Sequence, residues 1–107
     1  MAPELHVKTG VILAGLKPEM ARTVIRVMLI YSEYGVPAVI TSGLDGHHSS
    51  KSLHYVGLAL DWRTRHLPGG YLGPAAHAVR EQIAAVLGDD YDVVLEKDHI
   101  HVEYDPE

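Results

Sequence analysis

Two short stretches of this chain alternate between apolar and polar side chains, and this alternation constrains the fold more than any other feature. In residues 57–63 the apolar side chains fall on one side of an extended strand, and Asp61 falls on the other. Residues 99–104 repeat the pattern with His101 on the polar side. Each segment is therefore predicted to be a strand with one face in the core, while its other face carries groups that bind a cation or move a proton.

The amount of apolar sequence allows one hydrophobic core. Of the 107 residues, 47% are hydrophobic, which is enough for one compact domain and too little for two. We therefore expect residues 1–107 to form a single domain. Phe is absent and Trp62 is the only Trp, so aliphatic side chains must supply most of the burial.

Two segments have the residue spacing of amphipathic helices. The first helix is predicted over residues 18–34, with Pro18 in its first turn and an apolar face formed by Val24, Ile25, Met28 and Leu29. The second is predicted over residues 74–87, with a buried stripe formed by Ala76, Val79, Ile83 and Val86. Gly35 and Gly88 follow these segments and are suited to end them.

The remaining segments complete an α+β pattern. Residues 38–41 are predicted to form a short buried strand, and residues 43–53 an irregular surface segment. Residues 91–96 and 99–104 are predicted to form a hairpin that turns at Lys97 and Asp98. We therefore expect a small antiparallel sheet packed against two main helices.

Charge and composition exclude several classes of function. A formal net charge of −5 argues against general affinity for nucleic acid, which requires clustered Lys and Arg. No segment is apolar and long enough to predict membrane insertion, and Met1 to Gly15 lack the pattern of a secretion signal. We expect a monomer that is cytoplasmic or released on lysis; export by a route that the sequence does not reveal stays open.

Three residues supply the donor set of a catalytic zinc ion, which requires three protein ligands and a fourth position for water. Because Cys is absent, the ligands must be His and carboxylate, and His54, Asp61 and His101 provide them. His54 and Asp61 are seven residues apart, so they would point to opposite faces of one regular strand. They converge only if His54 lies outside the strand, and Gly57 provides a flexible point for that bend.

Asp98 is the candidate general base. It lies three residues before His101, at the predicted turn of the hairpin, from which its carboxylate can reach a metal-bound water. A carboxylate there can take a proton from that water and then deliver one to the leaving amine. Glu96 and Glu103 are rivals for this role, although each also fits an ordinary solvated carboxylate on a hairpin.

At these residues the sequence resembles the M15-type zinc peptidases. Their pattern S-x-H-x-x-G-x-A-x-D is matched by the run Ser52-Leu53-His54-Tyr55-Val56-Gly57-Leu58-Ala59-Leu60-Asp61. Residues 98–101 resemble the closing motif of the family, and the likeness runs from about Ser42 to Tyr104. The family contains D-Ala-D-Ala carboxypeptidases and dipeptidases, and the L-alanyl-D-glutamate endopeptidases of phage endolysins.

The resemblance implies a fold, a cofactor and a set of roles. It implies a Hedgehog/DD-peptidase-like fold in which His54, Asp61 and His101 bind Zn²⁺ and Asp98 is the catalytic carboxylate. One departure concerns an Arg that the family carries in an S-G-x-R stretch, because Asp45 stands at that place here. An acid cannot stabilise developing negative charge, so another cation replaces it or turnover and specificity differ.

Several other side chains are candidates for substrate binding or for support of a ligand. They are Ser52, His48, Lys51, Arg63 and His99, of which Lys51 and Arg63 are the candidate replacements for the missing Arg. His47 and His48 lie in a polar loop that needs no functional explanation, and His99 also fits an exposed strand residue. His6, His66 and His77 are predicted to be surface residues without a special role.

The function expected from these residues is zinc-dependent hydrolysis of a peptide bond in the peptidoglycan stem peptide. An L-Ala-D-Glu endopeptidase is favoured over a D-Ala-D-Ala carboxypeptidase, because a carboxypeptidase needs a cation for the terminal carboxylate. A catalytically inactive zinc-containing module that binds peptide or cell wall is the alternative, prompted by Asp45. A third possibility is that the histidines are structural and bind no metal.

Overall fold

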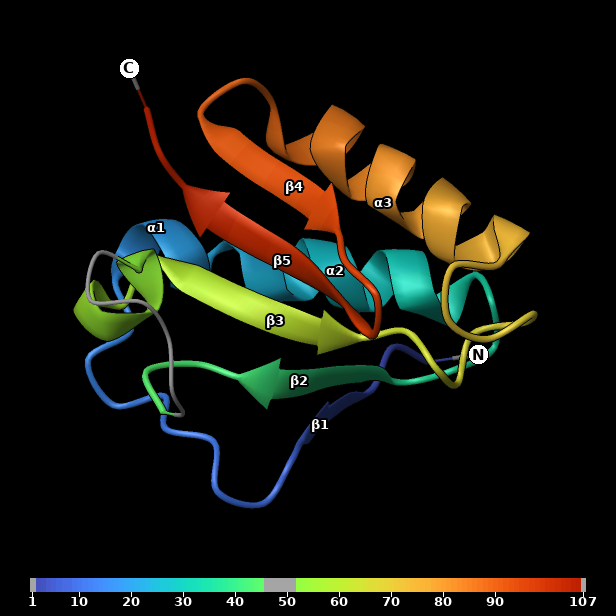
Figure 1. Ribbon diagram of the computed structural model, residues 1–107, viewed down its shortest axis with the longest axis horizontal. Helices are drawn as coiled ribbons and strands as arrows, with labels where there is room; N and C mark the ends of the chain where they lie inside the picture. The colour runs from blue at the N-terminus through green and yellow to red at the C-terminus, as the bar shows by residue number, and fades with distance from the viewer. Residues whose placement is uncertain (1, 46–51, 107) are drawn as a thin grey trace.

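The protein is an α+β structure built on one five-stranded mixed sheet, seen in a computed structural model that describes residues 2–45 and 52–106 (Figure 1). The strands lie in the order β1-β2-β3-β5-β4. Their bounds are Leu5–Val7 for β1, Ala38–Ser42 for β2, Ala59–Arg63 for β3, Tyr91–Leu95 for β4 and His99–Tyr104 for β5. The helices are α1 at Pro18–Ala21, α2 at Thr23–Ser32 and α3 at Pro74–Leu87, with a 3₁₀ turn, η1, at Leu53–Val56.

The prediction of a purely antiparallel sheet is wrong, because β1 pairs in parallel with β2. Leu5 lies opposite Ala38 in this pairing. Parallel neighbours need a long crossover connection, which α1 and α2 provide here. β1 has only three residues, which are too few for a periodic pattern to predict it. The other pairings are antiparallel, as expected.

The predicted helix over residues 18–34 is divided into α1 and α2 at Arg22. The predicted apolar face is also wrong in part, because Ile25 and Leu29 are 54% and 49% exposed. The buried side chains of the two helices are instead Met20, Thr23, Val27, Ile30 and Tyr31. Residues 23–31 are apolar on nearly every side, so the spacing alone did not identify the face that packs on the sheet.

The second helix and the hairpin are confirmed. α3 has the predicted bounds and buries Ala76, Val79 and Ile83, although Val86 is 44% exposed. β4 and β5 form the hairpin, in which the Glu96 amide donates to the His99 carbonyl. In the part of the chain that the structure describes, no helix has the length and apolar content to cross a membrane.

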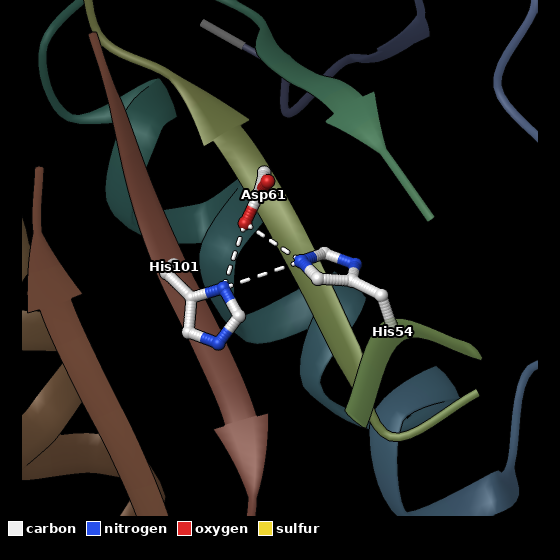
Figure 2. A group of neighbouring side chains, drawn as sticks. All are labelled: His54, Asp61 and His101. Atoms are coloured by element: carbon white, nitrogen blue, oxygen red, sulfur yellow. Dashed lines mark hydrogen bonds and ion pairs between the residues drawn. The ribbon is translucent and has the colours of Figure 1, made fainter. Parts of the chain in front are cut away.

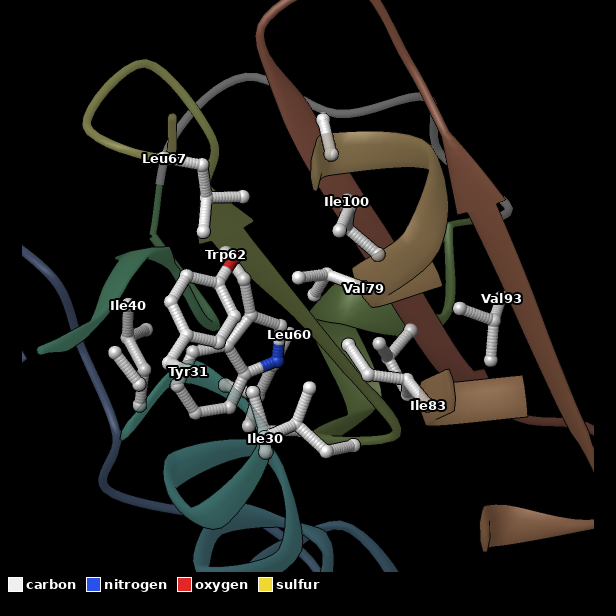
Figure 3. Packing of buried hydrophobic residues seen from close by; sticks show 14 of the residues in the cluster. Ile30, Tyr31, Ile40, Leu60, Trp62, Leu67, Val79, Ile83, Val93 and Ile100 are labelled. Atoms are coloured by element: carbon white, nitrogen blue, oxygen red, sulfur yellow. The ribbon is translucent and has the colours of Figure 1, made fainter. Parts of the chain in front are cut away.

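The hydrophobic core lies between the helices and one face of the sheet. α2 and α3 lie on the same side of the sheet, where the inward side chains of β3 and β5 meet them (Figures 1 and 3). These side chains are Leu60, Trp62, Ile100 and Val102, all fully buried. Asp61 and His101 alternate with them and therefore belong to the opposite face. The fold thus leaves one face of the sheet for chemistry.

Candidate metal centre

Three side chains predicted to bind a metal converge on the face of the sheet opposite α2 and α3 (Figure 2). His54 Nε2 lies 3.1 Å from Asp61 Oδ1 and 3.2 Å from His101 Nδ1. His101 Nδ1 lies 2.9 Å from Asp61 Oδ1, which closes the triangle. His54 and Asp61 are buried, with 2% and 7% exposure, and His101 is half-buried. The three residues form a possible metal-binding group.

Strand pairing and a tight turn bring these residues together. Asp61 on β3 and His101 on β5 are direct partners in the antiparallel register. His54 lies on η1, outside the strand, as the odd spacing required. Gly57 ends η1 with φ of 79°, and a Cβ at this position would collide with the carbonyl oxygen of Gly15. Glycine is therefore needed here both for the turn and for the close approach of residue 15.

The spacing of the donor atoms suits zinc. Bonds of 2.0–2.2 Å at tetrahedral angles place neighbouring ligand atoms about 3.3 Å apart. The observed distances of 2.9–3.2 Å are close to one triangular face of such a tetrahedron. Two imidazoles and one carboxylate also match the donor types of catalytic zinc sites, whose fourth position stays open. Both the chemistry and the geometry of the residues therefore fit the metal.

Hydrogen bonds at the far ring nitrogens orient both histidines. His54 Nδ1 donates to the Gly43 carbonyl at 2.7 Å, which turns Nε2 towards the other donors. His101 Nε2 lies 2.7 Å from Glu103 Oε1 and donates to it, which turns Nδ1 the same way. Such partners fix the ring orientation and the tautomer of a metal-binding histidine. The Gly43 contact joins separate segments and has no signal in the sequence, whereas strand alternation places Glu103 and His101, two residues apart, on one face of β5.

The electrostatics of the three side chains are strongly coupled. Burial opposes ionisation of Asp61, but hydrogen bonds from His101 and His54 prevail and hold the pKa of its carboxyl well below the ordinary value. The hydrogen bond to Asp61 raises the pKa of His101 to about 9, with a further contribution from Glu103. A carboxylate that stays ionised is what a cation requires, and a metal must displace the proton of His101 to bind.

Asp98 lies at the hairpin turn, as predicted, but outside the group of three donors. Its Oδ1 accepts a hydrogen bond from His99 Nδ1 at 2.6 Å, and this bond lowers the pKa of Asp98. His99 Nε2 in turn lies 3.7 Å from Asp61 Oδ2. Asp98, His99 and Asp61 all line one groove of about 330 Å³. The candidate base is thus ionised and connected to the metal donors through a single histidine.

Asp45, the departure from the family pattern, has a structural role. Its Oδ1 accepts hydrogen bonds from the backbone amides of Ile12 and Gly43 at 2.9 and 2.8 Å. The Leu44 amide donates to the Ile12 carbonyl at 2.8 Å, so hydrogen bonds join residues 43–45 to the backbone of residue 12. Because the Gly43 carbonyl holds the His54 ring, Asp45 supports the position of the first ligand.

The other predicted substrate or support residues divide into three groups. Arg63 and His99 line the groove beside Asp61. Ser52 caps η1 by accepting a hydrogen bond from the His54 amide at 3.2 Å, so it supports the backbone of a ligand and not its ring. His48 and Lys51 lie outside the described residues.

Comparison with known proteins adds nothing to this picture. A scan against protein-family models finds no match, and a search of curated proteins finds none either.

Proposed function

We propose that this chain is a zinc-dependent peptidase that hydrolyses an amide bond in the peptidoglycan stem peptide. The observation that carries the proposal is the triangle of donor atoms from His54, Asp61 and His101, which has the types and spacing of a catalytic zinc site. The substrate class comes from the motif resemblance alone. A polar groove runs beside the donors and includes Asp98, which supports a reaction at this position.

The residues of the chain supply the proton transfers. When bound, zinc supplies a Lewis acid that polarises the amide carbonyl and lowers the pKa of water towards ~7. Asp98 is kept ionised by the hydrogen bond from His99, so it can accept a proton from the attacking water and pass it to the leaving amine. His99 orients this carboxylate and contacts the Asp61 side of the site.

We favour the L-Ala-D-Glu bond over the terminal D-Ala-D-Ala bond. In the resembling family the Arg of the S-G-x-R stretch serves substrate binding, and here Asp45 holds that place and binds backbone amides. The Arg of the family is therefore replaced here by a residue that holds the backbone. An endopeptidase accepts a chain that continues beyond the cut.

Digestion of defined muropeptides by the zinc-loaded protein tests the proposal. We expect mass spectrometry to identify products cut between L-Ala and D-Glu, and we expect a chelator to abolish them. Absence of cleavage in every stem peptide would end the proposal. Zinc and peptide binding at one equivalent without hydrolysis would instead establish the catalytically inactive binding module.

Replacement of Asp98 tests the assignment of the base. Asp98→Ala should lower kcat by about 10²–10⁴ while zinc affinity is retained, because Asp98 is not among the metal donors. Asp89→Ala is the matched control, since Asp89 is also an exposed aspartate in a turn. Full turnover in Asp98→Ala would move the base role to another group.

A further inference from the structure

The groove beside the metal donors contains three cationic side chains, although the chain as a whole has a net charge of −5. Lys8 follows β1, Arg63 ends β3 and Arg65 lies in the loop after β3. These segments are far apart in sequence, and the β1-β2-β3 order of the sheet brings them to one groove. The hydroxyl-bearing Tyr71 lines the same groove. The fold therefore concentrates positive charge next to the metal donors.

Among the described residues, no carboxylate forms an ion pair with these cations. Within residues 2–45 and 52–106, no ion pair joins Lys8, Arg63 or Arg65 to an acid, whereas Arg80 pairs with Glu81 at 3.0 Å. The two acids of the groove are engaged elsewhere. Asp61 contacts His54 and His101, and Asp98 contacts His99. The donors of the three cations are therefore available to an anion that enters the groove.

Arg63 lies close to the reaction centre. It is two residues beyond Asp61 on the same face of β3, which corresponds to about 6.6 Å along the strand. In the register with β5 it lies opposite His99, the residue that holds Asp98. Arg63 can therefore bind an anionic group of a peptide substrate that lies within about two residues of the scissile amide, when that amide is at the metal donors.

We propose that Arg63, together with Arg65 and Lys8, binds a free carboxylate on the substrate residue that supplies the amine of the scissile amide. The inference rests on the proposed peptidase function and names the substrate feature that this site selects. Glutamate has two carboxyl groups, so one stays free when the other continues the chain. The D-Glu residue of an L-Ala-D-Glu bond therefore offers a carboxylate next to the cut. Arg binds a carboxylate through parallel, charge-assisted hydrogen bonds.

Two peptides that differ in a single charge test the inference. The first is acetyl-L-alanyl-D-glutamic acid γ-methylamide, whose α-carboxylate is free, and the second is its α-carboxamide. Binding to the zinc-loaded protein is measured by NMR titration, and cleavage is followed in the same samples by mass spectrometry. We expect the wild-type protein to prefer the carboxylate by about tenfold or more in Kd, or in kcat/KM where cleavage occurs.

Variants assign the preference to the groove. Arg63→Gln should remove most of the preference for the carboxylate peptide without a change in zinc affinity. Arg26 is exposed on α2, so Arg26→Gln should leave this preference intact. Because Arg63 is half-buried, a double replacement of the exposed Lys8 and Arg65 by Gln provides a second test that does not disturb β3. This double variant should also weaken the preference.

The outcomes separate this inference from the proposed function. Preference for the carboxylate without cleavage of this peptide or of any stem peptide would refute the peptidase and retain the carboxylate site. Cleavage of both peptides at equal rates would retain the peptidase and overturn the carboxylate site. Binding of neither peptide, or an unchanged preference in both groove variants, would overturn it as well.

Discussion

Glu103 is the residue whose role changed most between sequence and structure. Its carboxylate accepts the Nε2 proton of His101, and its side chain points along the same face of β5 as the histidine. A negative partner at Nε2 makes Nδ1 a better metal donor and holds the ring in place. Glu103 therefore holds one of the three candidate metal ligands in place, and its carboxylate is engaged by that histidine.

Removal of this carboxylate should weaken metal binding. We expect Glu103→Ala to raise the Kd for zinc about 10- to 100-fold, as measured by competition with a chromogenic chelator. Glu103→Gln keeps a hydrogen-bond acceptor and should have a smaller effect. Glu33→Ala, at an exposed glutamate that follows α2, is the control and should bind zinc normally. Unchanged affinity in Glu103→Ala would show that the hydrogen bond does not support the ligand.

His66 was predicted to be an ordinary surface residue, and this is wrong. Its Nε2 donates to the Pro37 carbonyl at 2.6 Å, and its ring stacks on Tyr31 at 5.7 Å between centroids. Nδ1 is buried without a partner among the described residues. Burial lowers the pKa of His66, because the proton of the charged form would have no acceptor in this position.

This lowered pKa predicts a contribution of His66 to acid sensitivity. Below pH ~6.5 the unfolded state binds the proton more readily than the folded state, so stability falls as pH decreases through that range. His66→Gln keeps an N–H donor for Pro37 and cannot titrate, so its free energy of unfolding should depend less on pH between 7 and 5. Urea titrations of both proteins across this range measure the difference. His77→Gln, at an exposed histidine on α3, should retain the wild-type slope.

At the scale of elements, the turn that ends η1 connects the first ligand to β3. Gly57 and Gly35 both have positive φ, of 79° and 73°. A Cβ at Gly57 would collide with Gly15, whereas a Cβ at Gly35 would meet no atom within 4 Å. The two glycines therefore differ in steric surroundings while they share a left-handed backbone conformation.

Replacement of each glycine by Ala separates strain from collision. Gly35→Ala should cost about 1 kcal/mol in the free energy of unfolding from the left-handed conformation alone. Gly57→Ala should cost about 1–3 kcal/mol more, because residues 15 and 57 must move apart. It should also weaken zinc binding, since His54 lies on the displaced turn. The free energies of unfolding are measured by thermal and urea denaturation. If Gly35→Ala and Gly57→Ala lower this free energy equally, the close contact with Gly15 would be contradicted.

At the scale of the whole molecule, three separate elements meet at the candidate metal centre. His54 comes from η1, Asp61 from β3 and His101 from β5, so a bound ion would link segments 47 residues apart in sequence. An ion that binds only the folded state stabilises it by mass action. Metal binding should therefore require that η1, β3 and β5 are folded and in their native arrangement.

Zinc should raise the thermal stability of the protein. At a free zinc concentration of about 100 Kd we expect the free energy of unfolding to increase by about 2.7 kcal/mol. For a domain of this size, each kcal/mol corresponds to a Tm increase of about 4–8 °C. Calorimetry with and without a chelator measures the shift, and His54→Ala should abolish it. A wild-type Tm that does not respond to zinc would contradict the metal centre.

The sequence by itself determined the local elements and the chemical nature of the site. The alternation around Asp61 and His101 specified two strands with one apolar face each, because side chains of a strand alternate by covalent geometry. The odd spacing of His54 and Asp61 required the bend at Gly57, for the same reason. The absence of Cys leaves only imidazole and carboxylate donors, so composition alone limits the candidate ligands to His, Asp and Glu.

Only the tertiary structure decided which segments became neighbours. The parallel pairing of β1, the break at Arg22 and the buried face of α2 depend on packing between distant residues, which local periodicity does not encode. The same holds for the hydrogen bond from His54 to the Gly43 carbonyl, and for the groove that unites Lys8, Arg63 and Arg65. The groove arises from the order of strands in the sheet, because that order sets which side chains share a surface.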